Sequence, residues 1–236
     1  MRIHGIQLAY GDDETLGQRR DRVVGLLREQ SGADLVVLPE LWAHTGFGWR
    51  GWEANAEPLD GPTVTAVAEA AAELRTTVHA GSIIERAADG RLYNTAVLIG
   101  PDGGRLASYR KIHRFGFSAG EPTLLQAGED LVVTDLPAGT PGGTGATGRT
   151  VRTALATCYD LRFPELFRAL LRSEPAPELF VVPAAWPKPR LSAWTVLGQA
   201  RALENQAIVI QVNTAGTHRL ATMARMTTMA AMGRAA

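Results

Sequence analysis

Three side chains that can serve acyl transfer each follow a short apolar run in the sequence. They are Glu40 after residues 35–38, Lys111 after residues 106–109, and Cys158 after residues 153–157. Such runs predict buried strands, and strand ends in an α/β sheet meet at a crevice where ligands bind. If these three ends converge, they supply a thiol nucleophile, a carboxylate base and a fixed positive charge, which cysteine-based acyl transfer requires.

Cys158 is the only cysteine of the 236 residues and stands where a predicted strand gives way to a predicted helix. Pro164 suits the first turn of that helix, because its missing N–H would have no partner there anyway. A thiol at such a turn meets the positive end of the helix dipole, which favours the thiolate. The backbone N–H of Tyr159 is then a candidate oxyanion donor. On its own, a lone cysteine is more often a small buried apolar side chain.

Glu40 is the candidate general base, and Lys111 is the candidate cation beside the developing oxyanion. Glu40 would protonate the leaving amine or ammonia and later activate the water that releases the acyl group. Each residue alone has a plainer interpretation, because a charged residue at a strand end is usually solvated or half of an ion pair. The coincidence of the three positions favours the catalytic interpretation.

The composition argues against several classes of protein. The chain has 24 basic and 24 acidic residues and no formal net charge, which argues against a nucleic-acid or a polybasic membrane partner. A single cysteine excludes an intramolecular disulfide framework and fits a reducing compartment, so we expect a cytoplasmic protein. The apolar runs are shorter than the roughly 20 residues that span a bilayer, and the amino-terminal run is too short for a signal peptide.

Hydrophobic periodicity predicts alternating strands and helices at both ends of the chain and a series of paired strands in the middle. The predicted strands cover residues 3–9, 34–38, 77–84, 93–99, 106–109, 131–136, 151–157, 179–182 and 208–212. The predicted helices begin after Thr15, at Pro62, at Pro164 and at Leu191. This order indicates a layered α/β fold with mixed sheets and no domain linker. The glycine-rich residues 137–148 lack the ending of a P-loop, so we interpret them as a surface connection.

Five segments resemble the motifs of the nitrilase superfamily of carbon–nitrogen hydrolases. They are Leu38-Pro-Glu40-Leu41, Tyr109-Arg-Lys111-Ile-His113, Cys158-Tyr-Asp-Leu-Arg-Phe-Pro-Glu165, Pro183-Ala-Ala-Trp-Pro187 and Ala200-Arg-Ala-Leu-Glu-Asn-Gln206. The resemblance implies a four-layer α-β-β-α sandwich and a Glu–Lys–Cys triad at Glu40, Lys111 and Cys158. It also implies a second glutamate near the lysine, for which Glu121 is the match, and a homodimer or larger homo-oligomer. The family needs no metal or organic cofactor.

Aromatic residues near the predicted site are candidates for the substrate pocket. Trp186 follows a predicted strand end, and Phe47 lies in the aromatic loop after the second predicted strand. Aromatic residues at such positions are as often part of the core. We expect substrate contacts from Tyr159, Trp186 and Phe47. For His113, which lacks partner ligands, we expect a structural hydrogen-bonding role.

The resemblance covers residues 1–216, which we interpret as one carbon–nitrogen hydrolase domain, and it stops after Gly216. In residues 217–236 methionine recurs every third residue from Met223 to Met232, without a clear amphipathic pattern. We expect this atypical tail to reflect a frameshifted or truncated carboxyl terminus. In that case one sheet lacks its last strands and has an open edge.

Together the motifs predict a hydrolase of a non-peptide C–N bond in a small linear amide or N-carbamoyl compound. The reaction would pass through a thioester at Cys158 and release ammonia or an amine. One alternative is a nitrile hydrolase, which the sequence does not separate from an amidase. Another is a catalytically silent binding or scaffold protein of the same fold. The complete set of candidate catalytic residues argues against this second alternative.

Overall fold

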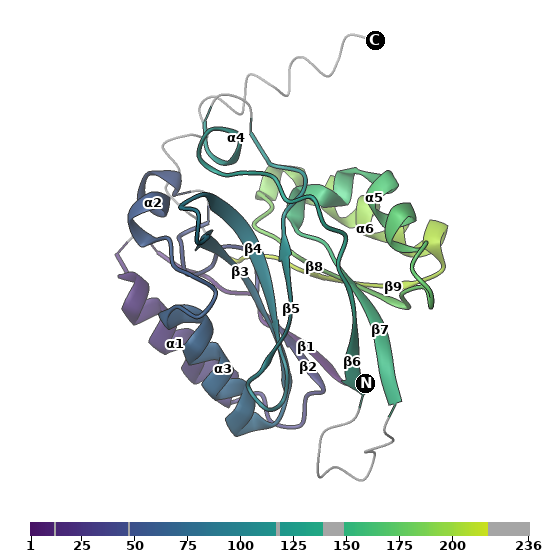
Figure 1. Cartoon of the computed structure of the whole chain (residues 1–236), viewed down its shortest axis with the longest axis horizontal. Helices are drawn as coiled ribbons and strands as arrows, with labels where there is room; N and C mark the ends of the chain where they lie inside the picture. Colours follow the sequence, from purple (N-terminus) through teal and green to yellow (C-terminus); the bar gives the residue numbers. More distant parts are fainter. Residues whose placement is uncertain (12, 47, 117–118, 139–148, 217–236) are drawn as a thin grey trace.

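Two β-sheets, each with helices on its outer face, make up the described part of the chain (Figure 1). The computed structural model describes residues 1–11, 13–46, 48–116, 119–138 and 149–216. The first sheet has the order β1 (Ile3–Gly5), β2 (Leu35–Val37), β3 (Thr77–Arg86), β4 (Leu92–Ile99) and β5 (Arg105–Arg110). The second has the order β6 (Val133–Ala138), β7 (Arg149–Leu155), β8 (Leu179–Pro183) and β9 (Ile208–Val212).

Both sheets are mixed, as predicted. Strands β1, β2 and β3 are parallel, whereas β3, β4 and β5 pair as antiparallel neighbours. In the second sheet β6 and β7 are antiparallel, and β7, β8 and β9 are parallel. The parallel pairs are joined by crossovers that contain helices, which is the usual connection for parallel strands.

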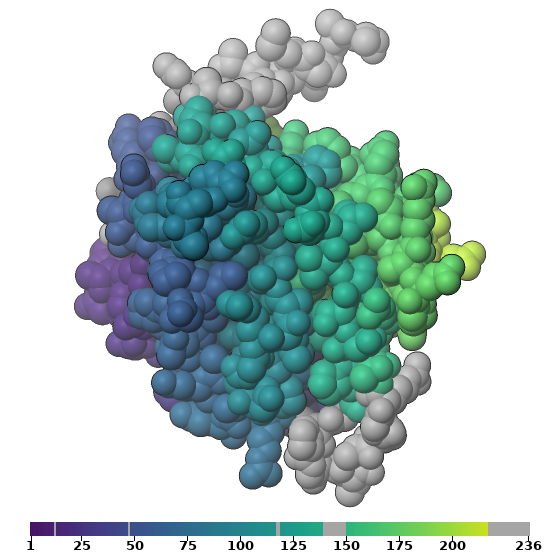
Figure 2. Space-filling view, in the orientation of Figure 1, coloured from purple at the N-terminus to yellow at the C-terminus, as the bar shows by residue number. Residues whose placement is uncertain are grey.

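Helices cover the outer face of each sheet, which completes four layers and confirms the predicted α-β-β-α sandwich. Figure 1 shows α1 and α3 on one side of the molecule and α5 and α6 on the other. The space-filling view shows the two halves packed against each other along the height of the molecule (Figure 2). The helical segments are α1 (Leu16–Arg28), α2 (Trp52–Asn55), α3 (Pro62–Leu74), α4 (Glu121–Leu124), α5 (Pro164–Leu170) and α6 (Leu191–Asn205), with 3-10 turns η1 (Trp49–Gly51), η2 (Cys158–Arg162) and η3 (Lys188–Arg190).

Strand side chains alternate between two apolar cores. In β8, Leu179 and Val181 lie in the core between the sheets, while Phe180 and Val182 lie in the core beneath α5 and α6. Alternate residues of a strand point to opposite faces, so a strand buried on both faces must be apolar at every position. This explains why the continuous apolar runs that precede Glu40 and Cys158 form strands.

Several predicted boundaries match those of the structure. Thr15 caps α1 through its side chain and forms a capping box with Gln18. The bounds of α3 and α6 agree with the prediction, and so do those of β9. In the described part of the chain, no helix combines the length and the apolar composition needed to cross a bilayer.

Two local predictions were wrong. The first strand covers Ile3–Gly5 and not residues 3–9, because its partner β2 ends at Val37, two residues before Pro39, which lacks the N–H needed to extend the ladder. The expectation that a helix begins directly after Cys158 was also wrong, because Cys158 starts the short 3-10 turn η2, whereas α5 begins at Pro164, as predicted. Most of the glycine-rich segment and all of the tail, residues 139–148 and 217–236, lie outside the described residues.

Candidate active site

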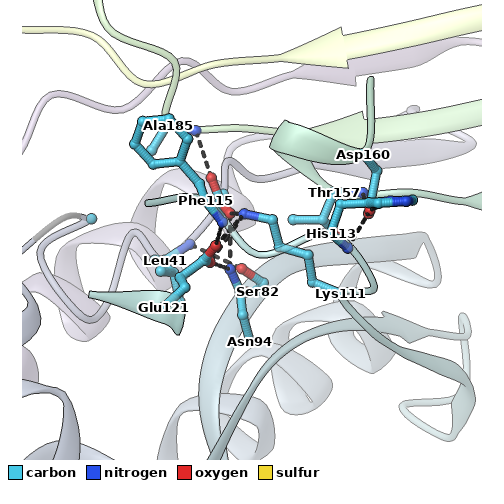
Figure 3. Close-up of polar contacts among 12 residues, drawn as sticks. Leu41, Ser82, Asn94, Lys111, His113, Phe115, Glu121, Thr157, Asp160 and Ala185 are labelled. Atoms are coloured by element: carbon cyan, nitrogen blue, oxygen red, sulfur yellow. Dashed lines mark hydrogen bonds and ion pairs between the residues drawn. The ribbon is translucent and has the colours of Figure 1, made fainter. Parts of the chain in front are cut away.

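Glu40, Lys111 and Glu121 form one buried cluster. Lys111 Nζ lies 2.8 Å from Glu40 Oε1 and 3.0 and 2.9 Å from the two carboxylate oxygens of Glu121. The three side chains are at most 2% exposed. Figure 3 shows Lys111 and Glu121 pointing toward each other. The structure therefore brings together three of the four residues predicted for the catalytic set, although Glu40 and Lys111 are 71 positions apart in the sequence.

Neutral donors complete the hydrogen bonding of the two carboxylates. The side-chain amide of Asn94 donates to Glu40 Oε1 at 2.8 Å and to Glu121 Oε1 at 2.7 Å. The backbone N–H of Ala185 donates to Glu40 Oε2 at 3.0 Å, and that of Phe115 donates to Glu121 Oε2. Buried charges are tolerated only when they are paired and hydrogen-bonded, and here both conditions hold.

A close approach of backbones fixes the turn that carries Glu40. Gly81 has φ +69°, and a Cβ atom at this position would lie 2.0 Å from the carbonyl oxygen of Pro39. Only glycine fits such a contact at positive φ. Leu41, which follows Glu40 in the sequence, has φ 47°. Its backbone N–H donates to Ser82 Oγ at 3.2 Å. The irregular register of β3 near Gly81 thus holds the segment that presents the carboxylate.

Cys158 follows β7 by three residues and has a left-handed backbone conformation, with φ 49°. Positive φ is uncommon for a residue with a side chain and persists only where the surroundings hold it. Asp160 provides this support. Its fully buried carboxylate accepts the N–H of Thr157 at 2.9 Å, the hydroxyl of Tyr109 at 2.7 Å and the N–H of His113 at 2.9 Å.

His113 has the structural role expected of it. Its Nδ1 lies 2.8 Å from Asp160 Oδ1, and its ring stacks on that of Phe163 with centroids 3.6 Å apart. Arg201 supports the same turn from α6, since its Nε donates to the carbonyl of Leu161 at 3.1 Å. These contacts tie the Cys158 turn to β5 and α6.

The thiol of Cys158 is not poised as a thiolate. Burial raises its pKa well above the usual value, the charge of Glu40 and a hydrogen bond to that carboxylate raise it further, and Lys111 opposes both. The expectation that a helix dipole would favour the thiolate is therefore wrong. The physical reason is that Cys158 is 3% exposed and begins a five-residue 3-10 turn, while α5 starts only at Pro164.

The ion pairs within the cluster decide the protonation state of Lys111. Burial alone would lower the pKa of Lys111, but the charges of Glu121 and Glu40 outweigh it and raise the pKa well above the usual value. Burial raises the pKa of Glu121, although Lys111 pulls it down. Lys111 is therefore a permanent cation at neutral pH.

A small cavity opens at Cys158. Its lining residues are Phe115, Cys158, Tyr159, Arg162, Trp186, Pro187 and Arg190. Two of the three predicted pocket residues, Tyr159 and Trp186, therefore line it. The third, Phe47, lies outside the described residues.

The charged side chains that line this cavity are both arginines. The Arg162 guanidinium lies 5.0 Å from the Trp186 ring centroid, and that of Arg190 lies 5.7 Å from the ring centroid of Phe115. The Arg190 carbonyl also accepts the indole N–H of Trp186 at 2.9 Å. The surface that faces the cavity is thus apolar, and two guanidinium groups lie close to its aromatic rings.

Sequence reasoning missed Asn94, Asp160 and Arg190. Asn94 had a detectable signal, because it is an amide side chain in the largely apolar run of β4, in which every residue is buried. Arg190 had none, because its place at the cavity depends on the path of the chain after β8. Among the described residues, no group of three His, Cys, Asp or Glu side chains is arranged to hold a metal ion.

The sequence is similar to one family of enzymes and to individual members of it. The family described as Carbon-nitrogen hydrolase matches residues 6–232. The chain is 42% identical to a 2-oxoglutaramate amidase of Paenarthrobacter nicotinovorans, over 91% of this chain and 70% of that protein. It is 35% identical to an omega-amidase of Bos taurus, over 80% of this chain and 66% of that protein. The aligned part thus spans about two thirds of each relative.

The fold is also similar to that of a solved structure. A CN-hydrolase superfamily protein from Xanthomonas campestris, described with an arsenic adduct in its active site, superposes with a TM-score of 0.79. The identity is 32%, and the match covers 93% of this chain and 77% of the other.

Proposed function

The chain belongs to the carbon–nitrogen hydrolase family, whose enzymes hydrolyse C–N bonds other than peptide bonds, and we propose that it hydrolyses a small linear amide at Cys158. One observation carries the proposal. The charge of Glu40 acts on the Cys158 thiol and raises its pKa, and Glu40 in turn pairs with Lys111 at 2.8 Å, next to a cavity that Cys158 lines. A nucleophile, a base close to it and a fixed cation are the parts that acyl transfer needs.

In the first half of the reaction Glu40 takes the thiol proton as Sγ attacks the amide carbon. The raised pKa of Cys158 makes this transfer necessary, since the thiol is protonated at rest. The oxygen of the tetrahedral intermediate gains negative charge, and Lys111 Nζ and the backbone N–H of Tyr159 are the groups that stabilise it. The C–N bond then breaks, and the proton held by Glu40 passes to the leaving ammonia or amine.

In the second half water hydrolyses the thioester. Glu40 accepts a proton from the water as its oxygen attacks the acyl carbon, and the C–S bond breaks to release the carboxylic acid. The proton returns to Sγ, which restores the resting thiol. Glu121 holds the Lys111 ammonium by two contacts of 2.9 and 3.0 Å, so the cation stays in place while Glu40 changes charge.

The cavity favours an amide whose acyl group ends in a carboxylate. Arg162 and Arg190 line it together with aromatic side chains, and guanidinium groups bind carboxylates by charge-assisted hydrogen bonds. The names of the relatives from P. nicotinovorans and B. taurus agree with this, since 2-oxoglutaramate is an amide of this kind. N-carbamoyl compounds and nitriles are the alternatives within the same chemistry.

We also propose a homodimer or larger homo-oligomer in a reducing compartment such as the cytoplasm. Apolar side chains are exposed on α6 and at the start of β9, with Leu203 79% and Ile208 61% exposed. Exposed apolar side chains that form one contiguous patch are typical of a surface that another protein covers, and α6 packs beside β9. A reducing compartment suits this chemistry, because the nucleophile must remain a free thiol.

A substrate panel tests the proposed reaction. Ammonia release is measured from an ω-carboxylate amide, its matching nitrile, its N-carbamoyl analogue and a neutral amide of equal length. We expect the ω-carboxylate amide to have the highest kcat/KM. A higher value for the nitrile would assign the chain to nitrile hydrolysis, and no turnover of any compound would favour a silent binding protein.

A further inference from the structure

Asn94 hydrogen-bonds every charged member of the cluster. Its Nδ2 lies 2.8 Å from Glu40 Oε1 and 2.7 Å from Glu121 Oε1. Its backbone carbonyl accepts the N–H of Lys111 at 2.8 Å. The orientation of the amide is fixed by these contacts, because the reverse orientation would place its oxygen against two carboxylates.

The buried position of Asn94 indicates that the amide serves a purpose other than stabilising the fold. Asn94 is 3% exposed, and its Oδ1 has no hydrogen-bond partner among the described residues. A buried carbonyl oxygen without a partner destabilises the fold, whereas an apolar side chain of the same size would not. What the amide provides instead is two N–H donors, one for each carboxylate.

A neutral donor shared by two carboxylates stabilises both of them without adding a charge. Glu40 and Glu121 carry like charges, and Lys111 alone neutralises one of them. Asn94 adds hydrogen bonds to both carboxylates without changing the net charge of the cluster. It is also independent of Lys111, so it still holds Glu40 when protonation weakens the pair between Glu40 and the ammonium.

We propose that Asn94 is a positioning residue of the hydrolase reaction, which holds Glu40 toward Cys158 and Glu121 toward Lys111 while Glu40 gains and loses a proton. The inference rests on the proposed roles of these four residues. It does not require Asn94 to touch the substrate.

The test compares Asn94→Leu with the wild type over a range of pH. Leucine has a similar size and no donors, so kcat should fall on the order of 10- to 100-fold, the effect expected for losing hydrogen bonds to a charged group. KM should stay within about twofold, because no substrate contact is lost. The acid limb of the pH profile should move to higher pH, because a carboxylate that loses a donor is more easily protonated. A residue with a structural role alone would leave this limb unmoved.

Thr95→Val is the matched control. Thr95 is the next residue of β4, fully buried, and its hydroxyl donates to Glu85 at 2.6 Å, outside the cluster. This variant should keep the wild-type kcat and pH profile while losing a comparable buried hydrogen bond. If Asn94→Leu does not fold, Asn94→Ser replaces it in the test. A hydroxyl can donate to only one carboxylate. We therefore expect a smaller fall in kcat, with the acid limb of the pH profile moving in the same direction.

The outcomes separate this inference from the proposed function. If an Asn94 variant folds and keeps the wild-type kcat and pH profile while Cys158→Ala is inactive, Asn94 has no positioning role and the proposed reaction stands. If Cys158→Ala is active, the proposed reaction is wrong and the inference falls with it.

Discussion

The hydroxyl of Tyr109 donates to the buried carboxylate of Asp160 at 2.7 Å, which joins the strand before Lys111 to the turn that holds Cys158. Burial raises the pKa of Tyr109 well above its usual value, and the charge of Asp160 raises it further, so this donor keeps its proton. The relative position of the cation and the nucleophile therefore depends on a hydrogen bond between residues that are 51 positions apart.

Tyr109→Phe should reduce kcat about tenfold and the free energy of unfolding by about 1.5–3 kcal/mol, the usual value of a hydrogen bond to a charged group. The measurements are steady-state kinetics and denaturant unfolding. Tyr93→Phe is the control, because Tyr93 lies on the neighbouring strand with its ring 4.0 Å from the Arg110 guanidinium. Equal losses in the two variants would contradict a specific role for the Tyr109–Asp160 bond.

The two arginines at the cavity predict a change in substrate preference. Arg162→Leu and Arg190→Leu should each lower kcat/KM for an ω-carboxylate amide by about 10- to 100-fold, because a charge-assisted hydrogen bond is lost. The value for a neutral amide of equal length should change by less than about threefold. Arg168→Leu, an exposed position on α5, is the control. A parallel fall for both substrates would show that the arginines stabilise the site and do not select the substrate.

Two buried histidines predict a loss of stability in acid. Burial lowers the pKa of His44 and that of His79 to about 4. The unfolded chain takes up protons below about pH 6.5, while the folded protein does not until about pH 4, so stability falls as the pH drops through this window. The contribution is about 3 kcal/mol for each ring at the most.

Denaturant unfolding at several pH values between 4 and 7 measures this effect. His79→Gln should reduce the slope of unfolding free energy against pH. Thr76→Val serves as the control, because it removes a buried hydrogen bond to Ala33 at 3.1 Å but no titrating group. The assignment fails if the slopes of the two variants are the same.

The exposed apolar residues of α6 predict self-association. Leu203→Lys should shift the sedimentation coefficient at micromolar concentration toward that of a monomer, because a charge at a covered apolar position opposes assembly. The control is Glu69→Lys, on α3 at the opposite side of the sandwich. A wild-type protein that sediments as a monomer at the same concentration would rule the assembly out.

Much of the fold could be predicted because its signals are local. Continuous apolar runs such as the one before Glu40 become strands buried on both faces, and Thr15, Pro62 and Pro164 mark where helices begin. The conformation of Cys158 could not be predicted. Its positive φ and raised pKa result from burial and from partners that are distant in the sequence.

The site was predictable to the extent that Glu40, Lys111 and Cys158 each follow a strand, while Glu121 came only from the resemblance to the family. Asn94, by contrast, acts through contacts to residues 54 and 27 positions away, and Asp160 accepts from Tyr109, His113 and Thr157, which belong to two separate segments. For residues 217–236 the frameshift hypothesis stays a prediction, which resequencing the source DNA tests. The family match extends to residue 232.

The most direct test of the proposed reaction is mass spectrometry of the protein during turnover of an ω-carboxylate amide. Acid quenching of the wild type should trap an acyl group on the peptide that contains Cys158, and Glu40→Gln should form this adduct more slowly because proton transfer from the thiol is slowed. Cys158→Ala should carry no adduct and release no ammonia. Ammonia release by Cys158→Ala at the wild-type rate would contradict the account.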